Sequence, residues 1–256
     1  MTEPARRGRL VVFGGQSNML GHRTATDGAK PTSSLVRAWD NGGAAGTWRQ
    51  AELGHPPFNV LGNPKGDPAD GPANNAALHF AVALAERTGD PVLLVGAPVN
   101  GSSIVSWQDE SAVNLERLLT ECRHALASEE AVAAGVTHAD TMLWHQGETD
   151  DEGAWMVKDP RLTDLPSYVA AFERMRSTLA RQSWWADDTR FIAGELVRDG
   201  WLSARNDFYG AGALNGPRDA VVSSEGLGHV GDRAHFDGRA LQLLGERMFE
   251  ARLSLG

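Results

Sequence analysis

Three residues of this sequence have the types needed for nucleophilic attack on an acyl carbon. Ser17 follows a short apolar run that ends in Gly14 and Gly15, a turn that can expose its hydroxyl. Asp232 and His235 lie three residues apart, just before the last segment with helical periodicity. A serine attacks an acyl carbon when a base takes its proton, and an imidazole oriented by a carboxylate is such a base. Each residue alone also has an ordinary explanation, since a serine after a strand often caps a helix or forms a turn.

Four short blocks of the sequence are together far more specific than any single residue. They are GQSNM at 15–19, NGSSIVSW at 100–107, WHQGETD at 144–150 and DRAHF at 232–236. In this combination and order they resemble the SGNH hydrolase superfamily, most closely its sialate O-acetylesterase-like and acetylxylan-esterase-like branch. The resemblance runs from near residue 10 to the end of the chain. The GxSxG elbow of α/β-hydrolases does not fit, because Met19 stands where its second glycine is needed.

The resemblance implies a role for each matched position. It makes Ser17 the nucleophile, His235 the general base and Asp232 the acid that orients the base. The backbone N–H groups of Ser17 and Gly101 would bind the oxyanion. Gln146 matches the position of a third, side-chain donor, where the superfamily usually has an asparagine. The exchange is chemically sensible, because both side chains end in an NH₂ donor.

Two further residues are candidates for binding a sugar. Trp107 lies just past the expected oxyanion loop and could stack on a sugar ring. Glu148 could bind a sugar hydroxyl, or it could brace the oxyanion loop. His145 could be mistaken for the catalytic base, but at a strand end beside Trp144 it is more typical of a packing residue.

The pattern of apolar residues predicts the elements that position these groups. Short apolar runs predict strands, and apolar spacing of three to four residues predicts helices. The predicted strands are Leu10–Phe13, Pro91–Val99, Thr141–Trp144, Arg190–Leu196 and Ala220–Ser223. The predicted helices are Asn74–Arg87, Leu115–Leu126, a segment from about Leu165, and Phe236–Leu253.

Strands that alternate with helices are typical of βαβ units and a parallel sheet. We therefore expect an α/β fold, a three-layer α/β/α sandwich with a central, mostly parallel sheet, as in flavodoxin-like SGNH hydrolases. In an open parallel sheet, ligands bind beyond the carboxyl ends of the strands. Three of the four blocks directly follow a predicted strand, so this rule predicts that they meet at one edge.

The segment 21–71 differs from the rest of the chain. It is rich in Gly, Pro and Asn and contains Trp39, Trp48 and Phe58. We expect a long ordered loop over the edge of the sheet, because structureless loops of this length are unusual in a compact domain. The sequence has no internal repeat and no convincing linker, which predicts one domain over residues 1–256.

Composition limits the possible partners. The chain has 256 residues, with 24 Lys and Arg against 33 Asp and Glu, and a formal net charge of −9. A negative surface repels phosphate backbones, so nucleic acid is not an expected partner. The longest apolar runs are strand-length, so we expect no membrane span. No apolar signal segment precedes the first strand, which makes a cytoplasmic location the default expectation and a secreted mature form the alternative.

We expect no metal and no cofactor. Cys122 is the single cysteine, so the chain can form neither an intramolecular disulfide nor a thiolate cluster. The zinc motif HExxH and the Walker A motif are missing from the sequence, and Gly14 and Gly15 do not begin a GxGxxG motif.

The sequence therefore predicts a serine esterase that hydrolyses O-acetyl esters, on acetylated xylan, sialic acid or another carbohydrate. One alternative is an esterase that acts on lipid, thioester or small-molecule esters. Another is a glycan-binding module without turnover, but a binding module has no need of Ser17, Asp232 and His235 together. Substrate choice lies in loops such as 21–71, which the resemblance does not fix.

Overall fold

The described residues of this computed structural model are 7–42, 46–61, 71–150, 159–212 and 214–256. Their strands form one seven-stranded sheet in the order β3-β2-β4-β1-β5-β6-β7. All neighbouring strands are parallel except β3, which is antiparallel to β2. The strands are β1 (Arg9–Gly15), β2 (Val36–Asp40), β3 (Thr47–Gln50), β4 (Val92–Gly96), β5 (Ala139–His145), β6 (Arg190–Gly194) and β7 (Asp219–Val222).

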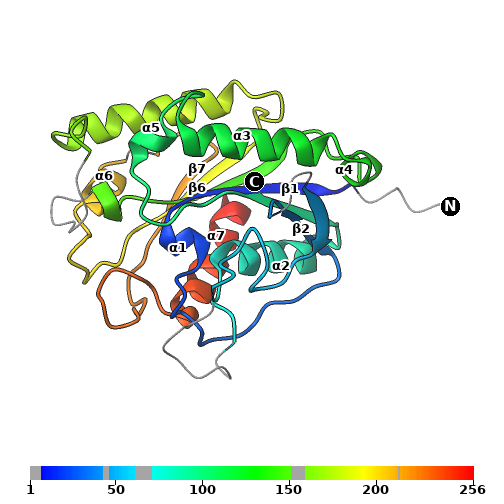
Figure 1. Cartoon of the computed structure of the whole chain (residues 1–256), viewed down its shortest axis with the longest axis horizontal. Helices are drawn as coiled ribbons and strands as arrows, with labels where there is room; N and C mark the ends of the chain where they lie inside the picture. Colours follow the sequence, from blue (N-terminus) through cyan, green and yellow to red (C-terminus); the bar gives the residue numbers. More distant parts are fainter. Residues whose placement is uncertain (1–6, 43–45, 62–70, 151–158, 213) are drawn as a thin grey trace.

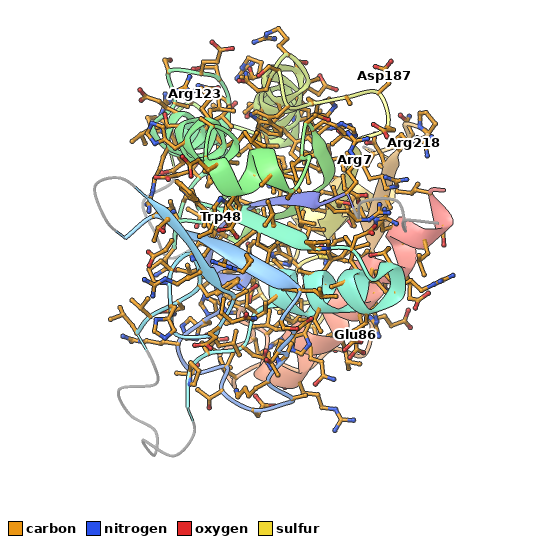
Figure 2. The ribbon with its side chains drawn as sticks, turned by 90° about the vertical axis from the view of Figure 1, so that its right-hand side faces the viewer. Arg7, Trp48, Glu86, Arg123, Asp187 and Arg218 are labelled. Atoms are coloured by element: carbon orange, nitrogen blue, oxygen red, sulfur yellow. The ribbon has the colours of Figure 1, made fainter. Side chains whose placement is uncertain are left out.

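Helices cover both faces of this sheet. Figures 1 and 2 show α3 (Val113–Leu126) and α5 (Leu165–Ala180) on one face, and α2 (Ala76–Thr88) and α7 (Gly238–Ser254) on the other. Shorter helices lie in the connections. These are α1 (Ser17–Leu20), α4 (Glu129–Ala133), α6 (Arg205–Gly210) and the 3₁₀ turns η2 (Ile104–Trp107) and η3 (Glu148–Asp150).

The alternation of side chains along β1 explains the two layers of core. Leu10 and Val12 belong to the cluster that faces α3 and α5, whereas Val11 and Phe13 belong to the cluster that faces α2 and α7. Successive side chains of a strand point to opposite faces, so a strand buried on both sides must be apolar throughout. The α/β/α sandwich with a mostly parallel sheet, and all five predicted strands, are confirmed.

The expectation that 21–71 is one long loop is wrong for its central part. Residues 36–40 and 47–50 form β2 and β3, which extend the sheet beyond β4. Trp39 and Trp48 face each other across these strands, with ring centroids 5.3 Å apart. Such short strands between Gly- and Pro-rich stretches leave too few alternating positions to stand out in the sequence.

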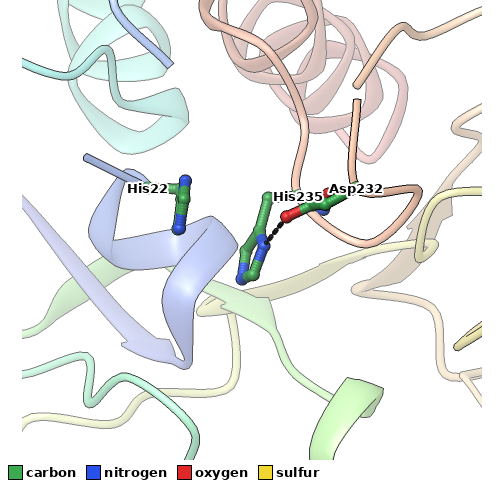
Figure 3. Close-up of side chains that lie close together, drawn as sticks. All are labelled: His22, Asp232 and His235. Atoms are coloured by element: carbon green, nitrogen blue, oxygen red, sulfur yellow. Dashed lines mark hydrogen bonds and ion pairs between the residues drawn. The ribbon is translucent and has the colours of Figure 1, made fainter. Parts of the chain in front are cut away.

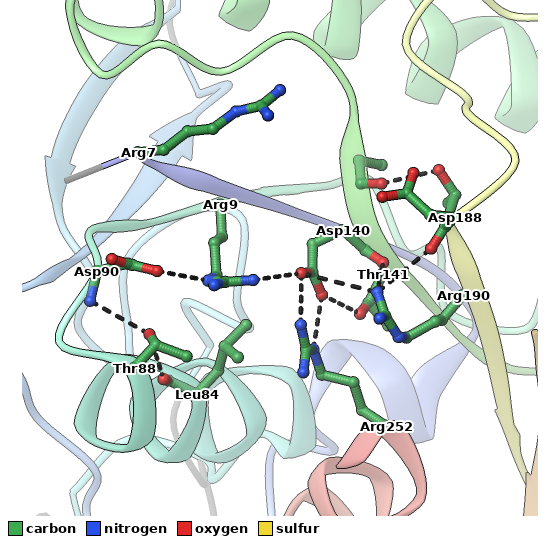
Figure 4. Close-up of polar contacts among 12 residues, drawn as sticks. Arg7, Arg9, Leu84, Thr88, Asp90, Asp140, Thr141, Asp188, Arg190 and Arg252 are labelled. Carbon is green, nitrogen blue, oxygen red and sulfur yellow. Dashed lines mark hydrogen bonds and ion pairs between the residues drawn. The ribbon is translucent and has the colours of Figure 1, made fainter. Parts of the chain in front are cut away.

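A buried carboxylate joins the amino ends of the central strands to the last helix. Asp140 of β5 accepts hydrogen bonds from Arg252 of α7 at 2.6 and 2.7 Å and from Arg9 of β1 at 2.9 Å (Figure 4). Burial alone would raise the pKa of Asp140, but the hydrogen bonds and charge of Arg252 and the charge of Arg190 outweigh it and lower the pKa to about 2. This ion network lies at the edge of the sheet opposite the four sequence blocks.

No helix within the described ranges combines the length and apolar character needed to cross a bilayer.

We predict that Asp140→Asn lowers the free energy of unfolding by about 2 kcal/mol at neutral pH, since one pKa unit corresponds to about 1.4 kcal/mol. The pKa of Asp140 is lowered on folding, so its contribution is present above about pH 4 and is lost as the pH falls toward 2. Urea unfolding of wild type and variant between about pH 7 and pH 3 tests this expectation. The difference should shrink below pH 4, and a difference that stays constant would contradict it.

Asp187→Asn is the matched control, because this carboxylate is exposed on the surface (Figure 2). Its effect should stay within about 0.5 kcal/mol at every pH.

Candidate active site

The turn between β1 and α1 places Ser17 at the carboxyl edge of the sheet. Gly15 has φ +126°, and a Cβ there would overlap the carbonyl oxygen of His145. The next N–H group, that of Gln16, donates to this same carbonyl at 2.9 Å. Only glycine permits β1 and β5 to approach so closely at this point. Ser17 is therefore held as the first residue of α1, 3% exposed.

Ser17, His235 and Asp232 form a continuous chain of hydrogen bonds. His235 Nε2 lies 2.9 Å from Ser17 Oγ. His235 Nδ1 lies 2.6 Å from Asp232 Oδ2 (Figure 3). A carboxylate only accepts, so Nδ1 carries the proton of the neutral ring and Nε2 is free to accept from the Ser17 hydroxyl. The structure thus brings together the two ends of the chain that the sequence singled out.

Asp232 also shapes its own loop. Its Oδ1 accepts the backbone N–H groups of Ala234 and His235, both at 2.9 Å. Partial burial would raise the pKa of Asp232, but the hydrogen bonds from the side chain and backbone of His235 and from the Ala234 N–H hold the pKa well below its usual range. Asp232 therefore stays a carboxylate across the physiological range and can orient a proton on His235.

Asn18, next to the serine, ties three loops together. Its side chain is fully buried. Its Nδ2 donates to Glu148 Oε1 at 2.6 Å and to the Ala234 carbonyl at 3.0 Å, and its Oδ1 accepts the Phe236 N–H at 3.0 Å. Asn18 stands inside the GQSNM block, but its residue type alone did not predict this role.

Ser17 and His235 open onto a pocket of about 460 Å³. A volume of this order suits one small ligand or one sugar unit. Its wall combines apolar side chains with polar ones; these include Leu20, Leu61, Leu202, Gln16, Asn100 and Glu148.

The two residues whose backbone N–H groups were predicted as oxyanion donors, Ser17 and Gly101, both line this pocket. The Ser17 N–H lies in the first turn of α1, where N–H groups have no partner inside the helix. Gly101 lies beyond β4 at φ +66° and lines the pocket. Its loop is fastened to the end of β1, because the Val99 N–H donates to the Gly15 carbonyl at 2.9 Å.

The arrangement of Gln146 corrects the prediction that its amide is an oxyanion donor. Gln146 is fully buried. Its Nε2 donates to the Ser102 carbonyl at 3.1 Å and to Asp150 Oδ2 at 2.6 Å, and its Oε1 lies 3.2 Å from the Tyr168 hydroxyl. Both N–H bonds of the amide are therefore used inside the protein. The function of this side chain is to fasten the loop after β5 to the loop after β4.

Gln16 offers an amide donor that the sequence analysis missed. Its Oε1 accepts the N–H groups of Gly147 at 3.3 Å and Thr149 at 3.4 Å, so the oxygen end of the amide faces the loop after β5. The side chain lines the pocket, and among the described residues its Nε2 has no hydrogen-bond partner. The identity of this side chain was visible in the sequence, but the direction of its amide depends on contacts with residues far along the chain.

The prediction that Trp107 stacks on a sugar is also corrected. Trp107 is fully buried, its indole N–H donates to Ser102 Oγ at 2.9 Å, and its ring packs edge-on against Trp144 with centroids 5.2 Å apart. It is a core residue, and its hydrogen bond to Ser102 supports the loop after β4.

Glu148 and His145 have structural surroundings, as a brace and a packing residue respectively. Glu148 lines the pocket, but it is only 4% exposed and its Oε1 accepts from Asn18. This contact makes it a brace for the site rather than an open ligand for sugar. His145 is fully buried, lies 3.0 Å from the Glu195 carbonyl through Nε2 and packs on Phe236.

A second histidine, which the sequence analysis did not single out, lies against the catalytic candidate. The rings of His22 and His235 stack with centroids 4.0 Å apart and planes 18° from parallel (Figure 3). His22, His235 and Asp232 could offer three metal-ligating atoms. Lone pairs of stacked rings point side by side rather than toward one centre, and both nitrogens of His235 already have partners. This arrangement does not favour a metal ion.

The similarity of this chain to known proteins is one of family and fold. A family model described as "Carbohydrate esterase, sialic acid-specific acetylesterase" matches residues 7–254. None of the curated proteins compared with the chain matches it.

Solved structures share the fold. A protein from Arabidopsis thaliana is 18% identical with a TM-score of 0.69, over 97% of this chain and 98% of that one. A carbohydrate acetylesterase from Xanthomonas citri is 17% identical with a TM-score of 0.59, over 95% of this chain and 55% of that one. A family two carbohydrate esterase from Clostridium thermocellum, solved with cellohexaose, is 12% identical with a TM-score of 0.52, over 100% and 68%.

The buried contacts of Asn18 lead to a stability prediction. Asn18→Ala should lower the free energy of unfolding by about 3 kcal/mol, because it leaves buried groups on two other loops without partners. Asn18→Asp should be at least as destabilising, since it replaces the donor to Glu148 by a second carboxylate. Urea denaturation of the wild type and the two variants measures both changes in the free energy of unfolding.

Asn59→Ala is the matched control. Asn59 also makes two hydrogen bonds beside the pocket, to the Gly21 carbonyl and from the Leu61 N–H, but it is only half-buried. Its loss should cost about 1 kcal/mol. Equal effects of Asn18→Ala and Asn59→Ala would show that Asn18 has no special structural function.

Proposed function

The chain belongs to the carbohydrate esterase family of sialic acid-specific acetylesterases, and from this premise we propose that it removes O-acetyl groups from a carbohydrate with Ser17 as nucleophile. The observation that carries the proposal is the Ser17–His235–Asp232 hydrogen-bond chain, of which Ser17 and His235 line the pocket. A glycan-binding module without turnover would not require a hydroxyl, an imidazole and a carboxylate in this order.

The proposed first step is attack of Ser17 Oγ on the acetyl carbonyl carbon. The C–O bond to the serine forms as the Ser17 proton passes to His235 Nε2 and the carbonyl π electrons move onto oxygen. The carboxylate of Asp232, 2.6 Å from Nδ1, stabilises the imidazolium that results.

The proposed oxyanion site combines backbone and side-chain donors. The N–H groups of Ser17 and Gly101 and the Nε2 of Gln16 would donate to the oxyanion, with Gln16 in place of Gln146. Preorganised donors of this kind lower the barrier because they need no rearrangement as charge develops.

The proposed cycle closes by hydrolysis of the acetyl-enzyme. Collapse of the tetrahedral intermediate breaks the ester C–O bond, and His235 gives its proton to the departing sugar hydroxyl. Water then attacks the acetyl group on Ser17 with His235 again as base, and acetate leaves with regeneration of the serine.

A second candidate substrate class is an ester with a larger apolar acyl group. It is favoured by the leucines of the pocket wall, Leu20, Leu61 and Leu202, of which Leu61 is 67% exposed. Rates with p-nitrophenyl acetate, butyrate and octanoate separate the two classes, because an acetyl-specific site should lose activity with each added length of chain. Acetate release from acetylated xylan, O-acetylated sialic acid and acetylated monosaccharides then identifies the sugar.

We predict that Ser17→Ala loses several orders of magnitude in kcat on p-nitrophenyl acetate with an unchanged melting temperature, because it removes the covalent route. A kcat within about tenfold of wild type would exclude Ser17 as the nucleophile.

The proposed donor gives a second kinetic prediction. Gln16→Ala should lower kcat by about 10²-fold with little change in KM, as expected for loss of one oxyanion donor. Gln16→Glu should be at least as impaired, because it places a negative charge against a negative transition state.

Gln146→Ala is the comparison that separates the two glutamines. It removes buried hydrogen bonds, so its main effect should be a loss of stability. If Gln146→Ala lowered kcat without loss of stability while Gln16→Ala kept wild-type kinetics, the side-chain donor to the oxyanion would be Gln146 and not Gln16.

A further inference from the structure

The catalytic candidate His235 lies on a loop that burial does not immobilise. The side chains of His235 and Asp232 are 23% and 42% exposed, and residues 231–235 belong to neither a helix nor a strand. Rotation about the bond to an imidazole ring has a broad energy profile. The hydrogen bonds at the two nitrogens restrain this rotation, but the bond between Nε2 and the Ser17 hydroxyl is lost once that oxygen carries the acyl group. A group on the face of the ring would hold the imidazole in place at that stage.

We propose that His22 is that group: a positioning residue whose ring, stacked on His235, holds the imidazole with Nε2 toward Ser17. The stacked geometry, with centroids 4.0 Å apart and planes 18° from parallel, covers one face of His235 (Figure 3). This inference rests on the proposed function, because it assigns His22 to the same reaction.

The chain holds His22 itself in place. Gly21 ends α1 with φ +89°, and its N–H donates to the Ser17 carbonyl at 3.0 Å, so the nucleophile and His22 belong to one short unit. His22 Nδ1 lies 2.8 Å from Thr24 Oγ1, a contact at the edge of the ring that restrains its rotation. The positions of Ser17 and of the stacking ring therefore cannot change independently.

The neutral state of the His22 ring also suits a residue that positions His235. Burial, and next the nearby charge of His235, lower the pKa of His22 to about 4, with Arg23 acting in the same direction and Asp232 against it. His22 is thus neutral at neutral pH. When His235 becomes an imidazolium during the reaction, it faces a neutral ring rather than a second cation.

Three substitutions separate stacking from the other roles that His22 could have. His22→Ala removes the ring, His22→Phe keeps a flat ring without hydrogen-bonding groups, and His22→Gln keeps polar groups without a ring. We expect kcat on p-nitrophenyl acetate to fall about 10- to 100-fold in His22→Ala with KM nearly unchanged, as for a misplaced catalytic group. His22→Phe should recover most of that loss, and His22→Gln should not.

His124→Ala is the matched control, because it removes an exposed imidazole from α3. It should leave kcat and KM unchanged. Recovery by His22→Gln rather than His22→Phe, or an increase in KM without loss of kcat, would overturn the proposal in favour of a polar contact with substrate. Wild-type kinetics in His22→Ala would overturn it directly.

A spectroscopic measurement does not depend on turnover. The His235 Nδ1 proton, hydrogen-bonded to Asp232, should give a downfield ¹H NMR signal that is present in the wild type and His22→Phe and is broadened or lost in His22→Ala. An unchanged signal in His22→Ala would overturn the positioning role. If the wild type hydrolysed no ester but this pattern held, the proposed function would fall while the positioning of His235 by His22 would stand.

Discussion

The site depends on one buried amide, that of Asn18. Its three hydrogen bonds connect the segment after β1 with the loop after β5 and with the loop that contains Asp232 and His235. The first two segments follow strands that pair in the sheet, whereas the third is up to 218 residues from Asn18 in the sequence and is held to them by the Asn18 side chain. A buried amide with unsatisfied partners costs more than the same bonds gain, so the geometry in which all three contacts form is strongly preferred. The distance between Ser17 and His235 follows from this fixed arrangement.

The sheet supplies the frame in which that amide can act. Parallel strands end at one edge, so the loops after β1, β4 and β5 are neighbours regardless of their separation in the sequence. Gly15 lets the first of these loops leave the sheet directly beside His145. The charged network around Asp140 lies at the other edge. Stabilising ion pairs and the candidate chemistry are thus kept apart, and the charges of one do not perturb the other.

The sequence predicted the features that depend on residues close together in the chain. Strands such as β1 and β5 are short apolar runs, and Ser17, Asp232 and His235 stand in compact blocks whose residue types are fixed by the chemistry they suggest. The sequence did not predict the direction in which individual side chains point. The types of Gln146 and Trp107 permitted a functional role, but their side chains point into the core, and that direction is set by Asp150, Tyr168 and Trp144. The same limit explains why Gln16 and His22 were missed, since their importance lies in contacts with distant segments.

The partial exposure of the Asp232–His235 pair has a consequence for how such a site keeps its geometry. In a closed core, packing would fix every ring, but here the proposed base must stay accessible to an ester and to water. The pocket therefore replaces general burial by a few specific contacts: Oδ1 of Asp232 holds its own loop, and Asn18 holds the backbone on either side of His235. These contacts fix the backbone of the loop, but none of them touches the faces of the His235 ring. A neutral aromatic neighbour such as His22 restrains a face without adding charge or closing the pocket, which a second ion pair could not do.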